Sequence, residues 1–138
     1  MQGPKLRSMI KLLFVCIENS NRSQMAEAFA KIHGKEKIQS FSAGSHPSGI
    51  VNPKAIAAMK AIGYDMSGHS SKSVDHYLHE HFDFVIGMGC GDECPMIPAN
   101  HRLEWDITDP KNLDADQFHL IRDEIEAKVK ALLQSHKV

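Results

Sequence analysis

The residues of this chain best suited to chemistry are Cys16 and Arg22, which have five residues between them. Cys16 follows four apolar residues, Leu12–Val15, and Ser23 comes directly after Arg22. The guanidinium of arginine is a planar fork of donors that suits a tetrahedral oxyanion. A cysteine beside such a cation is biased toward the nucleophilic thiolate. A lone cysteine at the end of a buried strand is otherwise an inert hydrophobe, but the arginine at this spacing favours a nucleophilic site for phosphate-like groups.

The segment around this pair predicts a buried strand, a tight polar loop and a helix. Apolar residues recur at helical spacing after the loop, at Met25, Ala28, Phe29 and Ile32. Unpaired N–H groups and the positive end of the helix dipole favour an anion at such a junction. We expect the oxyanion loop to comprise Ile17, Glu18, Asn19, Ser20, Asn21, Arg22 and Ser23. Within it, Asn19 tolerates a left-handed backbone, and Ser23 can donate its hydroxyl to the Cys16 sulfur.

Two further segments carry side chains that could take part in chemistry. Asp109 precedes Pro110, which forces it out of a helix and gives a rigid, projecting carboxyl, although Asp-Pro is also common in ordinary turns. Cys90 and Cys94 have three residues between them, and this pair admits three interpretations. It could bind zinc together with nearby histidines, it could be two inert thiols, or it could be a resolving pair that forms a disulfide. The sequence of the segment alone leaves the three open.

The composition is that of an ordinary globular protein. The chain has 138 residues, 42% of them hydrophobic and 24% charged, with a formal net charge of −1. Nothing in it indicates a nucleic-acid surface or a membrane patch. Three widely spread cysteines favour reduced thiols in the cytoplasm over a secreted disulfide framework. We expect residues 1–9 to be a disordered extension and residues 10–138 to form one domain.

The hydrophobic pattern places strands and helices in alternation. Strands are predicted at 38–42, at 82–87 and, as a short piece, at 103–105, after the first strand that ends at Cys16. Helices are predicted at 22–33 with Gly34 as its C-cap, from a cap at Asn52 to Gly63, at 75–81, and at 115–134. This alternation predicts an α/β three-layer sandwich: a four-stranded parallel sheet with helices on both faces. In such sheets the sites lie beyond the carboxyl ends of the strands, where Cys16, the Cys90–Cys94 segment and Asp109 can converge.

The chain resembles the arsenate reductases built on the low-molecular-weight protein tyrosine phosphatase fold. The resemblance rests on the Cys16–Ser23 loop, Ser42–Gly44, Asn52–Ser71, the cysteine pair and Asp109–Pro110. It implies a nucleophilic Cys16, an anion-binding Arg22 and a general acid at Asp109. It also implies that Cys90 and Cys94 relay a disulfide to thioredoxin or another thiol reductant, in an order that their spacing leaves open.

The resemblance further implies what the site binds. The substrate would be an arsenate or phosphate oxyanion. Some family members hold a potassium ion at residues that match Asn19, Glu27 and Ser42, but Lys72 stands where an acidic ligand is expected. We therefore expect the Lys72 ammonium in place of the ion, and no metal or other cofactor. None of the nine histidines is assigned to chemistry, and surface positions are expected for them.

Two other functions remain as alternatives. One is a phosphatase acting on phosphotyrosine or small aryl phosphates, which would not require the cysteine pair. Phosphatases of this fold usually carry aromatic residues at the mouth of the site, and the Lys111–Asp114 segment has none. The other is a non-catalytic thiol sensor or metal-binding module that uses Cys90 and Cys94, which would leave the Cys16–Arg22 spacing unexplained.

Overall fold

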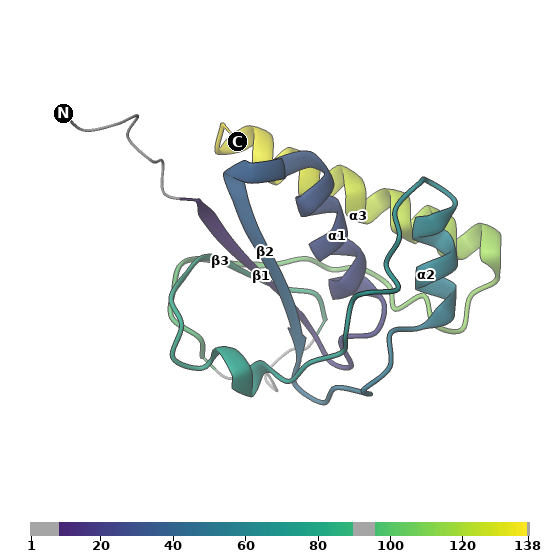
Figure 1. Ribbon diagram of the computed structural model, residues 1–138, viewed down its shortest axis with the longest axis horizontal. Coiled ribbons are helices and arrows are strands. Elements are labelled where there is room, and N and C mark those ends of the chain that lie inside the picture. The colour runs from purple at the N-terminus through teal and green to yellow at the C-terminus, as the bar shows by residue number, and fades with distance from the viewer. Residues whose placement is uncertain (1–8, 90–95, 138) are drawn as a thin grey trace.

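The computed structural model describes residues 9–89 and 96–137 (Figure 1). Strands and helices alternate along the chain, with two short 3₁₀ helices, η1 and η2, among them. In chain order they are β1 (Ile10–Cys16), α1 (Arg22–Gly34), η1 (Lys35–Lys37), β2 (Ile38–Gly44), α2 (Pro53–Lys60), η2 (Val74–Tyr77), β3 (Phe82–Gly87), β4 (Ala99–Glu104) and α3 (Ala115–Ser135). The part of the prediction that concerns residues 1–8 lies outside the described residues.

The four strands form one parallel sheet in the order β2-β1-β3-β4. Strand β1 lies in the interior of the sheet, and its residues from Leu12 to Cys16 are buried. Cys16 pairs with Gly44 at the end of β2, and Val15 pairs with Gly87 at the end of β3. The carboxyl ends of these strands therefore lie side by side, as predicted, and the segments that follow them share one edge of the sheet.

The two faces of the sheet bury alternate residues of β1 because side chains point to opposite sides along a strand. Leu12 and Phe14 belong to the larger core cluster, which contains residues from α1, α2 and α3. Leu13 and Val15 belong to a smaller cluster with Val74 of η2. Figure 1 shows the three long helices together on one side of the sheet. The predicted three-layer arrangement is confirmed, and its thinner layer is formed by η2 and loop segments.

The boundaries of several elements differ from those predicted. Strand β2 extends to Gly44, and the helix expected at 75–81 is the 3₁₀ turn η2. The predicted fourth strand is present, but it begins at Ala99 and ends at Glu104, so the predicted bounds of 103–105 were wrong. Strand β4 lies at the edge of the sheet and its side chains are mostly exposed, so it lacks the apolar alternation that would reveal a strand in the sequence.

Gly34 has a different role from the expected C-cap. It is the last residue of α1, with a φ of −91°, and it is Lys35 that adopts the positive φ, at 51°. A Cβ at position 34 would collide with the side chain of Ile38 at the start of β2. The glycine is therefore explained by the close approach of the helix end to the sheet, not by a left-handed turn.

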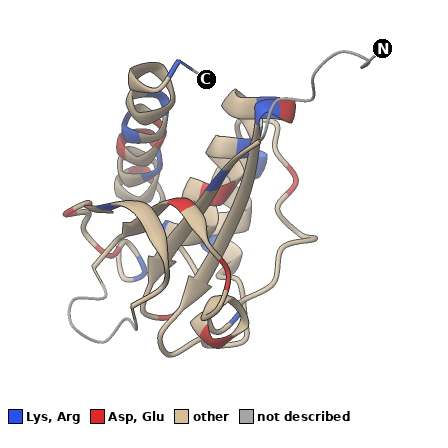
Figure 2. Ribbon diagram, turned by 90° about the vertical axis from the view of Figure 1, so that its left-hand side faces the viewer, with Lys and Arg blue, Asp and Glu red and all other residues tan. Residues whose placement is uncertain are grey.

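Side-chain caps begin two of the α-helices. The Asn52 Oδ1 accepts a hydrogen bond of 2.9 Å from the Lys54 N–H, with Pro53 in the first turn, as predicted. The Asp114 carboxylate caps α3 in the same way. Figure 2 shows charged residues of both signs interspersed along this last helix. In the described part of the chain, no helix combines the length and the apolar character needed to cross a membrane.

Candidate active site

The loop after β1 turns its carbonyl groups toward the segment that follows β2. The carbonyls of Cys16, Ile17 and Glu18 accept hydrogen bonds of 3.2, 2.7 and 3.1 Å from N–H groups of residues 45–48, and Ser20 accepts one of 3.1 Å from Asn52. In a trans peptide the carbonyl and the following N–H point in opposite directions. The N–H groups of the loop therefore point to the other side. Among the described residues, no hydrogen bond uses the N–H groups of residues 18–22, so they remain for a ligand.

Two residues allow the loop to fold so tightly. Asn19 adopts a φ of 52°, which confirms the expected left-handed backbone at this position. Gly44, paired with Cys16, lies so close that a Cβ there would be 2.9 Å from the Asn19 nitrogen. A side chain at position 44 would push the loop away, which is the physical reason for glycine there.

The Cys16 sulfur lies at the bottom of the loop and contacts the Ser23 hydroxyl, and the residue Cys16 is 3% exposed. The Sγ–Oγ distance is 2.8 Å. The Asn19 side-chain nitrogen donates a second hydrogen bond of 2.8 Å to the same hydroxyl. Ser23 therefore has its proton free to donate to the sulfur, and a donor stabilises a thiolate over a thiol. This contact agrees with the expected position of Ser23.

Arg22 begins α1 and its side chain spans the carboxyl end of the sheet. Its Nη1 donates a hydrogen bond of 3.0 Å to the Ile107 carbonyl, and its Nη2 lies 3.8 Å from the Asp109 carboxylate. Gly89, with a φ of 96°, leaves the guanidinium room, because a Cβ there would collide with Nη1. Arg22 is thus held by the segment after β4, and it lines the same cavity as the loop.

The loop, Arg22 and Asp109 enclose a cavity of about 140 Å³. Cavities that bind drug-sized ligands are on the order of 300–1,000 Å³, so this one suits a small oxyanion or the head of a larger ester. The lining residues are Cys16, Ile17, Glu18, Ser20, Asn21, Arg22, Asp109 and Lys111. Glu18 and Lys111 form an ion pair of 3.3 Å in this lining, and both side chains are nearly half exposed. Among the residues that the structure describes, none that lines the cavity is aromatic.

Asp109 directs one carboxylate oxygen to its own turn and the other to the site. Its Oδ1 accepts a hydrogen bond of 3.1 Å from the Lys111 N–H, and its Oδ2 is the atom near Arg22. Lys54, in the first turn of α2, donates to the carbonyls of Lys111 and Leu113 and ties the turn to that helix. Asp106 is exposed and does not line the cavity. The carboxyl is therefore held where a group leaving the bound anion could take its proton.

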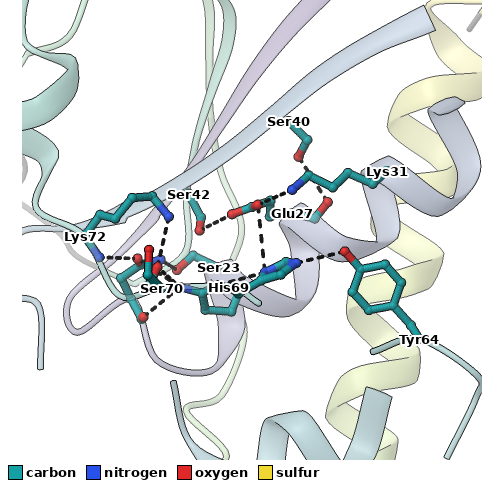
Figure 3. A network of polar contacts seen from close by, with 11 residues as sticks. Ser23, Glu27, Lys31, Ser40, Ser42, Tyr64, His69, Ser70 and Lys72 are labelled. Atoms are coloured by element: carbon teal, nitrogen blue, oxygen red, sulfur yellow. Dashed lines mark hydrogen bonds and ion pairs between the residues drawn. The ribbon is translucent and has the colours of Figure 1, made fainter. Parts of the chain in front are cut away.

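The residues that the family resemblance matches to a potassium site already form hydrogen bonds with one another and with lysines of this chain (Figure 3). The Glu27 carboxylate already accepts from the Ser42 hydroxyl and the Lys31 ammonium, each at 2.6 Å. The Asn19 side-chain oxygen accepts from the Lys72 N–H at 2.8 Å. Lys72 itself donates its ammonium to the Ser70 carbonyl, so the cation seated on Glu27 is that of Lys31, not of Lys72 as expected. Two neighbouring ammonium groups and occupied oxygens oppose a further cation.

One contact near the loop was missed in the sequence. The His69 side chain, expected at the surface, is only 8% exposed and lies 3.8 Å from the Glu27 carboxylate. It also contacts Gln24 in the first turn of α1. Burial lowers the pKa of His69 below its ordinary value, because desolvation disfavours the charged imidazole more than Glu27 favours it. His69 shares no sequence motif with the loop residues, so the contact becomes visible only in the folded structure. Cys90 and Cys94 lie outside the described residues.

This geometry can be compared with known proteins. A sequence model of the family described as "Low molecular weight phosphotyrosine protein phosphatase" matches residues 11–138. The chain is 39% identical to "Arsenate reductase 1" of Staphylococcus epidermidis over 131 residues, which cover 92% of this chain and 96% of that protein. It is 37% identical to "Glutaredoxin arsenate reductase" of Synechocystis sp., over 91% of this chain and 97% of that protein. A solved structure described as "An arsenate reductase in the phosphate binding state" superposes with a TM-score of 0.83 at 35% identity, covering 92% of this chain and 98% of the other.

Proposed function

We propose that this chain, which belongs to the low molecular weight phosphotyrosine protein phosphatase family, is an arsenate reductase that converts arsenate to arsenite. The observation that carries the proposal is the contact of 2.8 Å between the Cys16 sulfur and the Ser23 hydroxyl, at the bottom of a small cavity that Arg22 also lines. A nucleophile, an anion-binding fork and free N–H groups meet there. Relatives that align over nearly the whole chain are named arsenate reductases, and this favours arsenate as the substrate.

The first step is attack on the bound anion. Arsenate occupies the loop with its oxygens on the N–H groups and on the Arg22 fork. The Cys16 thiolate forms a sulfur–arsenic bond, and one arsenic–oxygen bond breaks. The Asp109 carboxylic acid gives its proton to the departing oxygen, which leaves as water. Arsenic remains in the +5 state in this step.

The second step reduces the arsenic. Cys90 or Cys94 attacks the Cys16 sulfur as a thiolate, and a disulfide forms. The sulfur–arsenic bond breaks with its electron pair on arsenic, which becomes arsenic(III) and leaves as arsenite. The two electrons therefore come from two cysteine sulfurs. The remaining cysteine of the pair then attacks the disulfide, frees Cys16, and leaves Cys90 and Cys94 joined.

An external thiol reductant must reduce that last disulfide. One relative is named a glutaredoxin arsenate reductase, and thioredoxin is the other reductant that we consider. The three residues between Cys90 and Cys94 do not decide between them. Either reductant implies that the protein works in a reducing compartment, and we propose the cytoplasm.

Hydrolysis of aryl phosphates is a secondary activity that the same site supports. Phosphate and arsenate have the same tetrahedral shape and charge, and the one structural neighbour named above is described in a phosphate-binding state. Asp109 lies beside Arg22, where it can protonate the oxygen of an aryl leaving group. Water would complete this reaction at Cys16 and no second sulfur would be needed.

The proposal is tested by following arsenite formation in two reconstituted systems. One contains NADPH, thioredoxin reductase and thioredoxin, and the other contains NADPH, glutathione reductase, glutathione and glutaredoxin. At least one system should show one NADPH oxidised for each arsenite formed, and the Cys16→Ser variant should show none, because a serine hydroxyl is not ionised at neutral pH. Absence of arsenite in both systems, with aryl phosphate hydrolysis intact, would instead indicate a phosphatase.

A further inference from the structure

Two oppositely charged side chains meet at the solvent end of the cavity. The Lys111 ammonium lies 3.3 Å from the Glu18 carboxylate, and both residues belong to the cavity lining. The Glu18 and Lys111 side chains are 43% and 46% exposed, whereas the Arg22 side chain is 10% exposed and Cys16 is buried. Exposure therefore increases from the sulfur outward, so this ion pair lies at the mouth of the cavity. We call Glu18 and Lys111 the mouth pair.

The mouth pair joins two segments that are 93 residues apart in the sequence, the loop after β1 and the turn after β4. On the first side, the Glu18 carbonyl accepts a hydrogen bond of 3.1 Å from the Ser48 N–H. On the other side, the Lys111 N–H donates to the Asp109 carboxylate, and the Lys111 carbonyl accepts from the Lys54 ammonium, each at 3.1 Å. Main-chain groups of both residues are thus held, and either side chain can be shortened without removing these bonds.

A ligand larger than a free oxyanion must share the mouth with this ion pair. An inorganic oxyanion is only the tetrahedral head that the cavity of about 140 Å³ accommodates. A phosphorylated side chain also carries an organic group, which extends from the bound head toward the solvent, where the mouth pair lies. This group has to displace or separate the two charged side chains. Separating an exposed ion pair lowers a binding constant by a factor of up to about five.

The mouth pair also sets the charge that an entering anion meets. The Glu18 carboxylate repels an anion and the Lys111 ammonium attracts it, and at a separation of 3.3 Å the two effects nearly cancel. Without Lys111, an unpaired carboxylate would oppose every anion. Without Glu18, a free ammonium would add to the charge of Arg22 and strengthen the binding of every anion, phosphorylated proteins included. Together the two side chains keep the mouth close to neutral.

We propose that the mouth pair determines the class of substrate: it admits free inorganic oxyanions and disfavours phosphorylated side chains of proteins. This inference rests on the proposed function in that the cavity binds the oxyanion, and it adds which ligands the same site rejects. The described part of the lining supports it further, because no aromatic side chain there could stack on the ring of a phosphotyrosine. Glu18 and Lys111 are thus specificity-determining residues, one on each side of the mouth.

The test measures ligand binding in the full-length protein by the protection of Cys16 against iodoacetamide, read by peptide mass spectrometry. One ligand is inorganic phosphate. The other is an otherwise uncharged peptide with phosphonomethyl-phenylalanine, a phosphotyrosine analogue that cannot be hydrolysed. Both ligands carry the same kind of anionic head, so a change of charge at the mouth affects both alike. The ratio of the peptide dissociation constant to the phosphate dissociation constant therefore reports the space at the mouth, and the phosphate constant alone reports the charge.

Glu18→Ala and Lys111→Ala each open the mouth, so the ratio should fall about two- to fivefold in both variants. The phosphate dissociation constant should fall about twofold in Glu18→Ala and rise about twofold in Lys111→Ala, because the charge at the mouth changes in opposite directions. The double variant should keep the lower ratio and return the phosphate constant close to the wild-type value. Glu80→Ala is the matched control: it removes an exposed carboxylate that pairs with Lys11 at 3.0 Å, outside the cavity lining, and should change neither quantity.

The outcomes separate this inference from the proposed function. A wild-type ratio in both single variants would overturn the inference, and so would a phosphate constant that moves in the same direction in both. If the ratio falls although no arsenite forms in the reconstituted systems, the proposed function fails and the selection by the mouth pair stands. If phosphate does not protect Cys16 of the wild type, the cavity is not an oxyanion site and both are contradicted.

Discussion

The Asp109 carboxylate lies 3.8 Å from the Arg22 guanidinium, and both residues line the cavity that Cys16 also lines. These two residues come from segments 87 positions apart in the sequence, the start of α1 and the turn after β4. Their proximity places a carboxyl beside the group that would bind the oxyanion. A bound anion would then lie between the sulfur that attacks and the carboxyl that protonates the departing oxygen.

Replacing Asp109 by asparagine should slow aryl phosphate hydrolysis most for those substrates whose leaving oxygen needs a proton in order to depart. We expect a loss of roughly 10²–10⁴ in rate for aryl phosphates with poor leaving groups and a smaller loss for good ones. Steady-state kinetics over a series of substituted phenyl phosphates would measure this. Asp106→Asn is the matched control, since that exposed residue does not line the cavity. An equal loss across the series would make Asp109 a structural turn residue.

Replacing Arg22 by lysine should weaken the binding of oxyanions as a class. A lysine keeps the charge but cannot form two parallel hydrogen bonds, nor reproduce the bond from Nη1 to Ile107. Inhibition of aryl phosphate hydrolysis by phosphate, arsenate and sulfate should weaken about tenfold or more, in line with roughly 1.5–3 kcal/mol for a charged hydrogen bond. Arg102→Lys on β4 is the control. Unchanged inhibition by all three anions would exclude Arg22 from the cradle.

The Cys90→Ser and Cys94→Ser variants should separate the two activities of the site. Each should stop multiple-turnover reduction of arsenate, because the pair then lacks one sulfur and Cys16 cannot be returned to a free thiol through a Cys90–Cys94 disulfide. Each should leave aryl phosphate hydrolysis nearly intact, because water completes that reaction. The ratio of the two activities, measured on one preparation, cancels differences in folded fraction. Wild-type arsenate reduction by both variants would show that no relay exists.

The buried His69 should make the protein less stable below neutral pH. Its pKa is lowered by burial in the folded state and is about 6.5 in the unfolded chain, so the unfolded chain binds the proton more tightly. The stability that the neutral ring contributes is complete above about pH 6.5 and is lost as the pH falls through the folded-state pKa. Each unit by which the two pKa values differ changes the free energy of unfolding by about 1.4 kcal/mol.

Urea unfolding at pH 5.5 and 7.5 would test this. The decrease in the free energy of unfolding between the two pH values should be smaller in His69→Gln than in the wild type. His79→Gln, at an exposed histidine, should keep the wild-type decrease. If the wild type and His69→Gln lost the same stability, the acid sensitivity would come from other groups.

The sequence was sufficient to predict those parts of the molecule whose structure depends on the types and spacing of neighbouring residues. The loop between β1 and α1 was predicted from Cys16, Arg22 and the helical spacing after them, and the structure places the cavity there. The left-handed Asn19 and the Asn52 cap were also predicted, because each depends on the preference of one residue at one position.

Other features depend on contacts between distant segments and left no pattern. Strand β4 is an exposed edge, so its apolar residues show no alternation. Gly34 was explained by a turn, whereas it makes room for Ile38. His69 is 45 residues from Gln24 in sequence, and its place beneath the loop follows only from how the chain returns to the sheet edge.

The most direct test of arsenate reduction at Cys16 is a single turnover without any external reductant. Fully reduced protein is mixed with excess arsenate, quenched with an alkylating reagent, and analysed for arsenite and for free thiols by mass spectrometry. We predict about one arsenite per chain, the loss of two free thiols, and a disulfide that includes Cys90 or Cys94. If all three thiols remain free and no arsenite forms, the chain does not reduce arsenate by this route.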